Sequence, residues 1–381
     1  MSIVNGEVQC YAGLSNEDNR VDEIERELSD LGLAAMSRYY SNSGLVNKFS
    51  MDNKEYREKN EKCKKAVLAY AGEQAGIKKF VTSTDIANAY SNDRFVTIKN
   101  TIVRDTILNV ITETTPAQIA AMATVEEVPV GASFTWEIDT KGLPIAQRNS
   151  YTSNVAFEDG HSMSPITITP KVYSLGTSID YIRILANNFD FGKEIARVAM
   201  GMLYAQYKLV ANTIFSTALL TGTPLYQASF SATNYVQMIS DLQMLNGGGD
   251  VKAYGTLPAF NAIGVIATTN YGFESQDEMI RNGYLGHAYG IDNICIDQAT
   301  DLSAPFNTAN ATNLRMVPNN KVVLMSSVAD RPVKLVREDF IHVKVKEPNV
   351  GSTYNASYDY FMSFDAAIAT QAHYGIQGTT A

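Results

Sequence analysis

Apolar residues recur at helical spacing in the first ninety positions. The stripe consists of Val21, Ile24, Leu28, Leu31 and Leu33, separated by charged residues. Residues 52–75 predict a second helix with carboxylates early and lysines later, as the helix dipole favours. A short helix is expected to begin at one of the capping residues of 82–85. Because these segments are rich in polar residues, residues 1–94 are predicted to form a solvated helical arm or extra segment.

The pattern changes after residue 95. The stretch 95–111 carries many β-branched residues, and periodicity alone leaves open whether it is a strand or a buried helix. Residues 95–130 are interpreted as the lead-in to the next unit.

A hairpin is predicted over residues 131–164. Phe134, Trp136 and Ile138 alternate with polar residues, which indicates a strand with one apolar face. A break at Lys141 forms the tip, and a return segment holds Val155 and Phe157. Since an isolated two-stranded hairpin is only marginally stable in water, its apolar face must be covered. We expect another subunit to cover it, with Phe134, Trp136, Ile138 and Lys141 as contact residues.

The strongest helical stripe of the chain follows. Residues 165–181 predict a strand with two prolines, and a long apolar stripe then begins after Asp190, the expected N-cap, and continues to about Leu220. Nearly thirty residues at about 1.5 Å each make a rod of roughly 40 Å. Such a rod, alone among short strands, is expected to support the whole subunit within residues 165–225.

The remaining chain predicts a mixed lobe and closing strands. Within 226–330 the pattern indicates a helix over 235–245, a buried strand over 261–269, and a short helix, glycine turn and strand over 276–296. Residues 331–381 contain alternating strands that are predicted to return to the unit of the long helix. The fold class is α+β.

Composition narrows the function. The 381 residues are 45% hydrophobic and 19% charged, which is enough for a core. A net charge of −9 argues against a protein that mainly grips nucleic acid. Cys10, Cys63 and Cys295 show no paired spacing, so no disulfide scaffold is expected. Neither an N-terminal secretion signal nor an eighteen-residue apolar run is visible, so a soluble protein without membrane contact is expected.

Signatures of catalysis are lacking in the sequence. The four histidines match no metal-ligand spacing, and His342 is expected at the surface of a strand. No nucleophile elbow, phosphate loop or dinucleotide fingerprint occurs. Cys63 lies among lysines that would lower its pKa if it were exposed, but an inert cysteine on a solvated helix is the preferred interpretation. No catalytic, cofactor-binding or metal-binding residue is predicted, and the protein is not expected to be an enzyme.

The order of the parts resembles the major capsid protein of tailed bacteriophages with the Hong Kong 97-type fold. The segment QDEMIRNGYLGHAYGIDNICID is similar to the helix, Gly-x-Leu-Gly turn and Gly-Ile strand of that family, at Gly283, Leu285, Gly286, Gly290 and Ile291. SIDYIRILANN, before the long helix, and SYDYFMSFDAAIAT are further likenesses. By this resemblance, which covers about 100–375, the hairpin is the extended loop, the rod is the spine helix of a peripheral domain, and residues 226–330 are the axial domain.

The resemblance implies a structural subunit that assembles in many copies into an icosahedral shell around double-stranded DNA. Its partners would be itself, as hexamers and pentamers, a portal, scaffolding or decoration proteins, and the DNA only indirectly. It would be located in the virion after assembly in the host cytoplasm. In some relatives a lysine such as Lys141 forms a covalent bond with an asparagine of a neighbour, and residues 17–80 are expected to assist assembly. Alternatives are an encapsulin-like compartment shell and a phage tail or adhesion protein.

Overall fold

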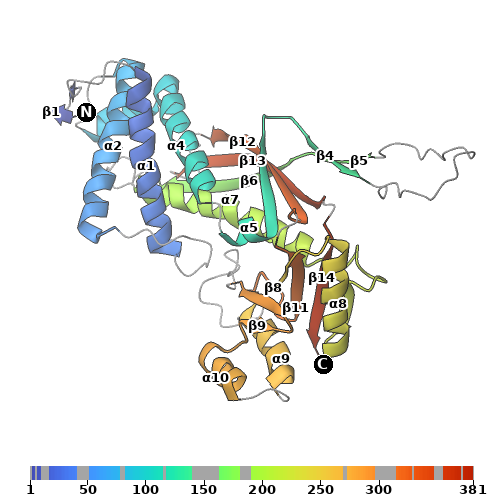
Figure 1. The fold of residues 1–381 in the computed structure, drawn as a ribbon. Coiled ribbons are helices and arrows are strands. Elements are labelled where there is room, and N and C mark those ends of the chain that lie inside the picture. Colours follow the sequence, from blue (N-terminus) through green and yellow to red (C-terminus); the bar gives the residue numbers. More distant parts are fainter. Residues whose placement is uncertain are drawn as a thin grey trace, which may run out of the picture.

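The described residues form helices, two larger sheets and two separate two-stranded hairpins (Figure 1). The computed structural model describes residues 2–4, 7–9, 17–40, 51–77, 82–114, 117–139, 163–180, 190–268, 273–296, 315–327, 330–346, 355–369 and 372–380. The helices are α1 (Glu17–Tyr40), α2 (Asn53–Ala75), α3 (Ser83–Tyr90), α4 (Asp93–Glu113), α5 (Ala117–Met122), α7 (Phe191–Ile214), α8 (Ala232–Leu245), α9 (Leu257–Thr268) and α10 (Phe273–Asn282).

The larger strands belong to two sheets. A four-stranded sheet has the order β3-β12-β13-β6, built from β3 (Ala123–Val128), β6 (Lys171–Asp180), β12 (Val333–Lys346) and β13 (Asn355–Ile368). A six-stranded sheet has the order β7-β14-β11-β8-β10-β9, built from β7 (Tyr226–Ser229), β8 (Val251–Gly255), β9 (His287–Ala288), β10 (Ile291–Cys295), β11 (Lys321–Ser326) and β14 (Tyr374–Thr380). Two hairpins are separate, formed by β1 (Ser2–Val4) with β2 (Glu7–Gln9) and by β4 (Phe134–Asp139) with β5 (Met163–Ile168).

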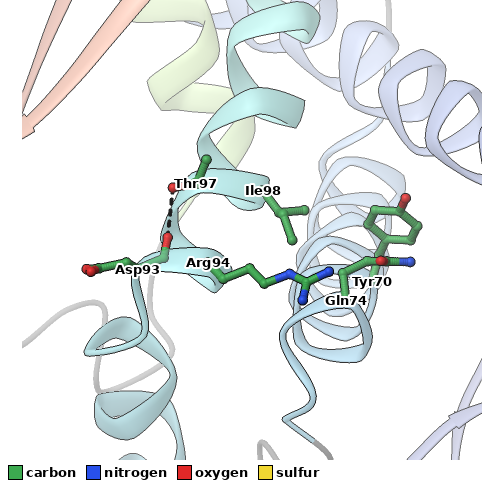
Figure 2. Close-up of a pocket in the computed structure, with 6 residues that line it drawn as sticks. All are labelled: Tyr70, Gln74, Asp93, Arg94, Thr97 and Ile98. Carbon is green, nitrogen blue, oxygen red and sulfur yellow. Dashed lines mark hydrogen bonds between the residues drawn. The ribbon is translucent and has the colours of Figure 1, made fainter.

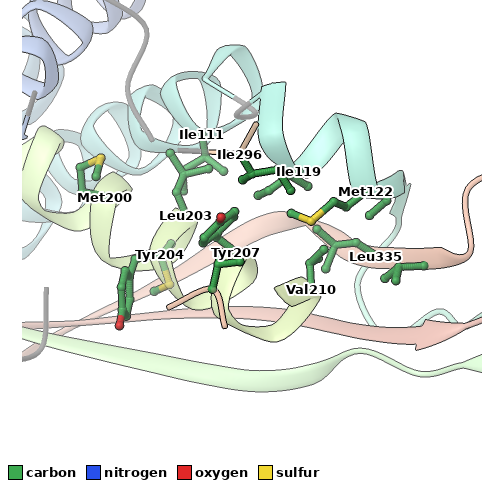
Figure 3. Close-up of a cluster of buried hydrophobic side chains, with 14 of the residues drawn as sticks. Ile111, Ile119, Met122, Met200, Leu203, Tyr204, Tyr207, Val210, Ile296 and Leu335 are labelled. Carbon is green, nitrogen blue, oxygen red and sulfur yellow. The ribbon is translucent and has the colours of Figure 1, made fainter. Parts of the chain in front are cut away.

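Helix α7 lies at the centre of the core. It is packed between helices α1, α4 and α5 on one side and the four-stranded sheet on the other (Figure 3). Asp190 is its N-cap, as predicted, and accepts a hydrogen bond of 3.0 Å from the backbone N–H of Lys193. The helix ends at Ile214 rather than near Leu220, so its 24 residues span about 36 Å. Helices α1, α2 and α4 have similar lengths, and the prediction of a single rod among short strands is wrong.

The predicted helices of the first ninety residues are present, but they are not a solvated arm. Leu28, Leu31 and Met36 of α1 are fully buried and belong to the same hydrophobic cluster as the α7 side chains. Close approach is possible because α1 and α7 meet at glycines: a Cβ on Gly32 would lie 2.8 Å from Ile195 Cγ2. The polar outer face misled the prediction, since a narrow apolar stripe is sufficient when small residues let helices approach.

Two ambiguous segments are helical. Residues 95–111, which the pattern left open, lie in α4, where Asn92 caps the helix and Phe95, Ile102 and Val110 share its buried face. The predicted strand over 261–269 is wrong, because residues up to Thr268 form α9. Pro258 in the first turn of α9 favours a helix start, and Phe260 N–H donates to Thr256 O at 3.0 Å.

The closing strands separate between the two sheets. Strands β12 and β13 pair with each other in the four-stranded sheet, as expected for a return to the unit of the long helix. Strand β14, in contrast, lies between β7 and β11 in the six-stranded sheet. We call this sheet, together with α8, α9 and α10, the lower lobe (Figure 1). Residues 331–381 therefore do not form one unit, and the chain end completes the lobe that includes 226–330.

Candidate assembly surface

The β4–β5 hairpin projects from the body of the molecule (Figure 1). The register pairs Phe134 with Ile168, Trp136 with Ile166 and Ile138 with Ser164, so the three predicted apolar contact residues share one face. On the opposite face, the hydroxyl groups of Thr135 and Thr167 are 2.9 Å apart. The hairpin is therefore a two-sided ribbon with an aromatic face and a hydroxyl face.

The base of the aromatic face packs on the chain's own four-stranded sheet. Phe134 and Trp136 contact a small cluster whose buried members are Val128, Ile168 and Val336. The two aromatic rings are 4.2 Å apart between centroids. The expectation that another subunit alone covers this face is corrected at the base, where residues of the same chain half-bury both rings.

Lys334 lies beside Trp136 at the base of the hairpin. Its side chain is almost fully buried, and its Nζ stands 5.9 Å from the Trp136 ring centroid, within the range of a cation–π contact. The same Nζ forms an ion pair with Asp330 and a hydrogen bond of 3.3 Å with Thr124 Oγ1. The charge of Lys334 is thus compensated by Asp330, while its Nζ also lies beside the Trp136 ring at the base of the hairpin.

The outer part of the hairpin extends beyond its seat, the buried cluster of Val128, Ile168 and Val336. Ile138 is half-exposed and does not belong to the buried cluster that seats Phe134 and Trp136. Lys141, Val155 and Phe157 lie outside the described residues. The structure therefore brings Phe134, Trp136 and Ile138 together, and Ile138 remains available to a partner.

Two residues of the apolar face were missed by sequence reasoning. Ile166 and Ile168 lie on β5, which the sequence reading joined to β6 as one strand. The alternation of Ile166 and Ile168 with threonines is the signal that identifies this second strand of the hairpin. Pro170, between β5 and β6, marks the break because proline interrupts a strand ladder.

A shallow hollow between α2 and α4 has a volume of about 600 Å³ (Figure 2). Arg94 points across it from α4 toward Gln74 and Tyr70 of α2, and Thr97 Oγ1 donates to Asp93 O at 2.8 Å. Its titratable lining residues, Asp93, Arg94 and Tyr70, form no nucleophile–base pair. We assign no chemistry to this hollow.

Cys63 and His342, two residues considered in the sequence analysis, lie in different environments. Cys63 is buried, which raises its thiol pKa to about 12 with help from Glu27, against the opposing lysines. The expectation that its helix is solvated at this position is therefore wrong. His342 is exposed on β12, as predicted. Within the described residues no cluster of three His, Cys, Asp or Glu side chains is arranged to hold a metal, and none of the helices is long and apolar enough to cross a bilayer.

Residues 27–345 match the profile of a family described as "SPbeta prophage-derived putative capsid protein YonB". The match covers well over half of the chain. The chain belongs to the YonB capsid protein family. No curated protein matches the YonB-family chain in sequence.

Solved structures similar to this YonB-family chain are capsids and a related shell. The capsid of an empty GTA particle is 12% identical with a TM-score of 0.44, covering 69% of this chain and 96% of the other. The capsid of cyanophage P-SCSP1u is 13% identical with a TM-score of 0.42, covering 67% and 85%. The encapsulin SrpI of Synechococcus elongatus PCC 7942 is 11% identical with a TM-score of 0.40, covering 70% and 88%.

The family assignment confirms the recognition made from the sequence. The protein is a phage capsid protein, and its fold combines helices and sheets in the order that the Hong Kong 97-type resemblance implies, with hairpin, long helix and mixed lobe following one another. It is a structural component of a virion capsid.

Proposed function

We propose that this chain is the major subunit of an icosahedral shell that encloses double-stranded DNA, and that it assembles as hexamers and pentamers in the host cytoplasm. A portal and scaffolding or decoration proteins would complete the particle. Membership of the YonB capsid protein family supports a shell role. The observation that carries the assembly mode is the projecting hairpin, whose apolar face continues beyond its seat on the chain's own sheet. The proposal is that its outer part lies across an adjacent subunit.

The described side chains offer no competing chemistry. The hollow between α2 and α4 lacks a nucleophile and base, and the buried thiol of Cys63 has a raised pKa. Affinity between copies would come from surface, since stable interfaces bury roughly 1,600 Å² in total. Aromatic side chains such as Trp136 and Phe134 are favoured anchors in such interfaces. A structural role without catalysis is the proposal these features favour.

The hairpin contact is tested with Ile138→Ser. Because Ile138 lies outside the seat formed by Val128, Ile168 and Val336, the change should leave the subunit folded and reduce the yield of closed particles at least tenfold. Particle yield by negative-stain imaging and subunit unfolding in urea are measured together. Glu137→Ala, on the exposed opposite face, is the matched control and should assemble normally.

Trp136→Ala gives a second measurement on the same face. It should impair particle formation, and it should also lower the free energy of unfolding by about 2 kcal/mol because the ring packs on Lys334 and Val336. Normal particle yields from both Ile138→Ser and Trp136→Ala would contradict the proposed contact. Filaments or small oligomers from the unaltered chain would contradict the shell itself, and closed particles carrying an enzyme rather than DNA would favour the encapsulin-like alternative.

A covalent bond from Lys141 to an asparagine of a neighbouring subunit is the finer proposal for the hairpin tip. If the bond forms, mature particles should give a ladder of multimers on a denaturing gel. Lys141→Arg keeps the charge but removes the primary amine, and should give monomers only. Monomers from the unaltered mature particles would exclude the bond.

A further inference from the structure

The exposed stripe of α7 is basic, although the chain as a whole is acidic. Of its 24 residues, the exposed ones are Lys193, Arg197, Lys208 and Asn212. Three are cations, and none is a carboxylate. The whole chain has 31 lysine and arginine residues against 40 aspartate and glutamate residues, so three exposed cations without a carboxylate depart from its average composition. The local charge therefore requires its own explanation.

The acidic residue of α7 does not neutralise this stripe at the surface. Glu194 is partly covered toward the sheet, and its Oε1 is buried. Burial raises the pKa of this carboxyl although Arg197 and Lys193 oppose the shift. Helix α2, in comparison, exposes four cations and four carboxylates: Lys54, Arg57, Lys62, Lys65, Glu55, Glu58, Glu61 and Glu73. The exposed charges of α7 are thus of one sign where those of α2 are balanced.

The stripe continues onto the end of α1. Lys193 Nζ stands 5.1 Å from the ring centroid of Tyr39, and the Arg38 guanidinium stands 5.7 Å from the same centroid. Both Arg38 and Tyr39 are exposed. Asp190, the carboxylate at this end, accepts hydrogen bonds from Lys193 N–H and from Tyr56 Oη–H, so these two bonds come from a backbone amide and a hydroxyl group rather than from a cationic side chain. We define the basic stripe as Arg38, Lys193, Arg197 and Lys208.

The dimensions of the stripe suit a nucleic acid backbone. Lys193 and Lys208 are fifteen residues apart on one helix, or about 22 Å along its axis. Duplex DNA advances about 3.4 Å per base pair, so this length corresponds to roughly six base pairs of phosphates. The faces of α7 that do not carry the stripe are packed in the core, and fifteen of its residues are buried. The cations are therefore presented on a rigid support.

We propose that the basic stripe contacts the phosphate backbone of packaged DNA and marks the face of the subunit that is turned to the shell interior. This inference rests on the proposed function, because only a DNA-filled shell supplies the ligand. The contact is independent of base sequence, since lysine and arginine on a single stripe meet phosphates rather than base edges. The acidic net charge limits DNA adhesion elsewhere, so binding would be confined to this face and weak enough to allow release.

The first test measures binding of the unassembled full-length chain to a short duplex of random sequence between about 50 and 200 mM salt. The test variant is Lys193→Gln/Arg197→Gln/Lys208→Gln. The matched control, Lys171→Gln/Lys252→Gln/Arg281→Gln, removes the same charge and the same residue types from cations that are paired with Asp365, Asp292 and Asp277. Both variants are first shown to unfold at the denaturant concentration of the unaltered chain.

We expect the stripe variant to bind DNA at least tenfold more weakly, with the slope of log K against log salt reduced by about 2 to 3, since each phosphate contact contributes about 0.9. The control should retain most of the affinity and slope. Equal losses in both variants would show that net charge alone matters and would overturn the proposal. Unchanged DNA binding with lost binding of polyglutamate would replace DNA by an acidic protein as the partner.

The second test uses assembled particles. Formaldehyde treatment of DNA-filled shells should attach nucleotides to peptides that contain Lys193 or Lys208, and not to those that contain Lys171 or Lys252. Attachment to Lys171 or Lys252 instead would place the stripe away from the DNA. Failure of the unaltered chain to form shells would contradict the proposed function, whereas normal DNA-filled shells without these adducts would contradict this inference alone.

Discussion

At the scale of single residues, Asp190 joins two distant parts of the chain at the N-terminus of α7. Asp190 accepts hydrogen bonds from Lys193 N–H at 3.0 Å and from Tyr56 Oη–H of α2 at 2.8 Å. The first bond was predictable, because aspartate before an apolar stripe is a common cap. The second was not, since the two residues are 134 positions apart. One carboxylate thus begins the central helix and ties α2 to it.

Glu25 is the residue from which we predict a pH dependence. Burial raises its pKa from the ordinary 4.5 to about 7, Asp105 and Asp22 add to the shift, and Arg104 opposes it. Below 4.5 the group is protonated in both states and adds nothing to the pH dependence. Between 4.5 and 7 only the unfolded chain loses the proton, so stability falls as pH rises, and above 7 the full penalty remains.

The test is Glu25→Gln. We expect this variant to be more stable than the unaltered chain by about 1 kcal/mol above pH 7, a value reduced for the partial exposure of the group, and nearly equal to it below 4.5. Urea unfolding at both pH values measures the effect. Glu23→Gln, an exposed position on the same helix, is the control. A gain that is the same at both pH values would contradict the assignment.

At the scale of elements, the packing of α1 on α7 depends on glycines within helices. A Cβ on Gly192 would lie 2.7 Å from Tyr56 Oη and 2.8 Å from Leu31 Cγ, too close for either to be tolerated. Inside a helix, glycine is about 1 kcal/mol less favourable than alanine. At this crossing the missing side chain lets the two helices approach closely, which offsets that loss. The sequence predicted a solvated α1 because α1 has few apolar residues. The prediction did not consider that glycines such as Gly32 and Gly192 let the two helices approach closely.

We predict that Gly192→Ala lowers the free energy of unfolding by about 2 kcal/mol, because overpacking at the crossing exceeds the gain in helix propensity. Gly201→Ala is the matched control on the same helix. There the added Cβ meets only the side chain of Leu175, which is half-exposed and able to move, so the change should be close to neutral. Chemical denaturation of both variants measures the difference; equal destabilisation would show that the crossing is not special.

At the scale of the whole molecule, the chain end completes a sheet that begins far away in sequence. Strand β14 pairs antiparallel with β11 and parallel with β7, so it is an inner strand of the lower lobe. Ile376 is fully buried, and Gly378 lies so close to the backbone of Ala228 that no side chain would fit. The chain passes between the two sheets after α7, again between β11 and β12, and again between β13 and β14, so the lobes are linked by three chain segments.

Truncation after residue 369 should disrupt the lower lobe while the helices around α7 remain folded. Removal of β14 leaves β7 without a neighbouring strand and exposes the hydrogen-bonding edge of β11 that β14 pairs with. Amide hydrogen exchange should show lost protection in β7, β8 and β11 and retained protection in α7. Removal of Ala381 alone serves as the control. Uniform loss of protection throughout the chain would show that the lobes do not fold separately.

The sequence by itself determined the local elements and the family resemblance. Caps such as Asp190, the alternation of Phe134, Trp136 and Ile138, and the glycine turn at Gly283 act over a few residues, where steric and hydrogen-bonding preferences are decisive. It also excluded familiar catalytic motifs. These properties can be predicted without the tertiary structure because they depend on residues that are close together in the sequence.

Only the tertiary structure decided what covers each apolar face. An apolar stripe indicates that a face must be buried, but it does not show what covers it. Contacts between distant residues decide that α1 packs on α7, that the Trp136 ring lies beside Lys334, and that β14 joins the six-stranded sheet. The same holds for α9, where a run of apolar residues fits a strand or a helix until its neighbours are known. A face is buried only when a second surface covers it. The pattern of residues along the chain shows each apolar face separately and does not show which distant segment covers it.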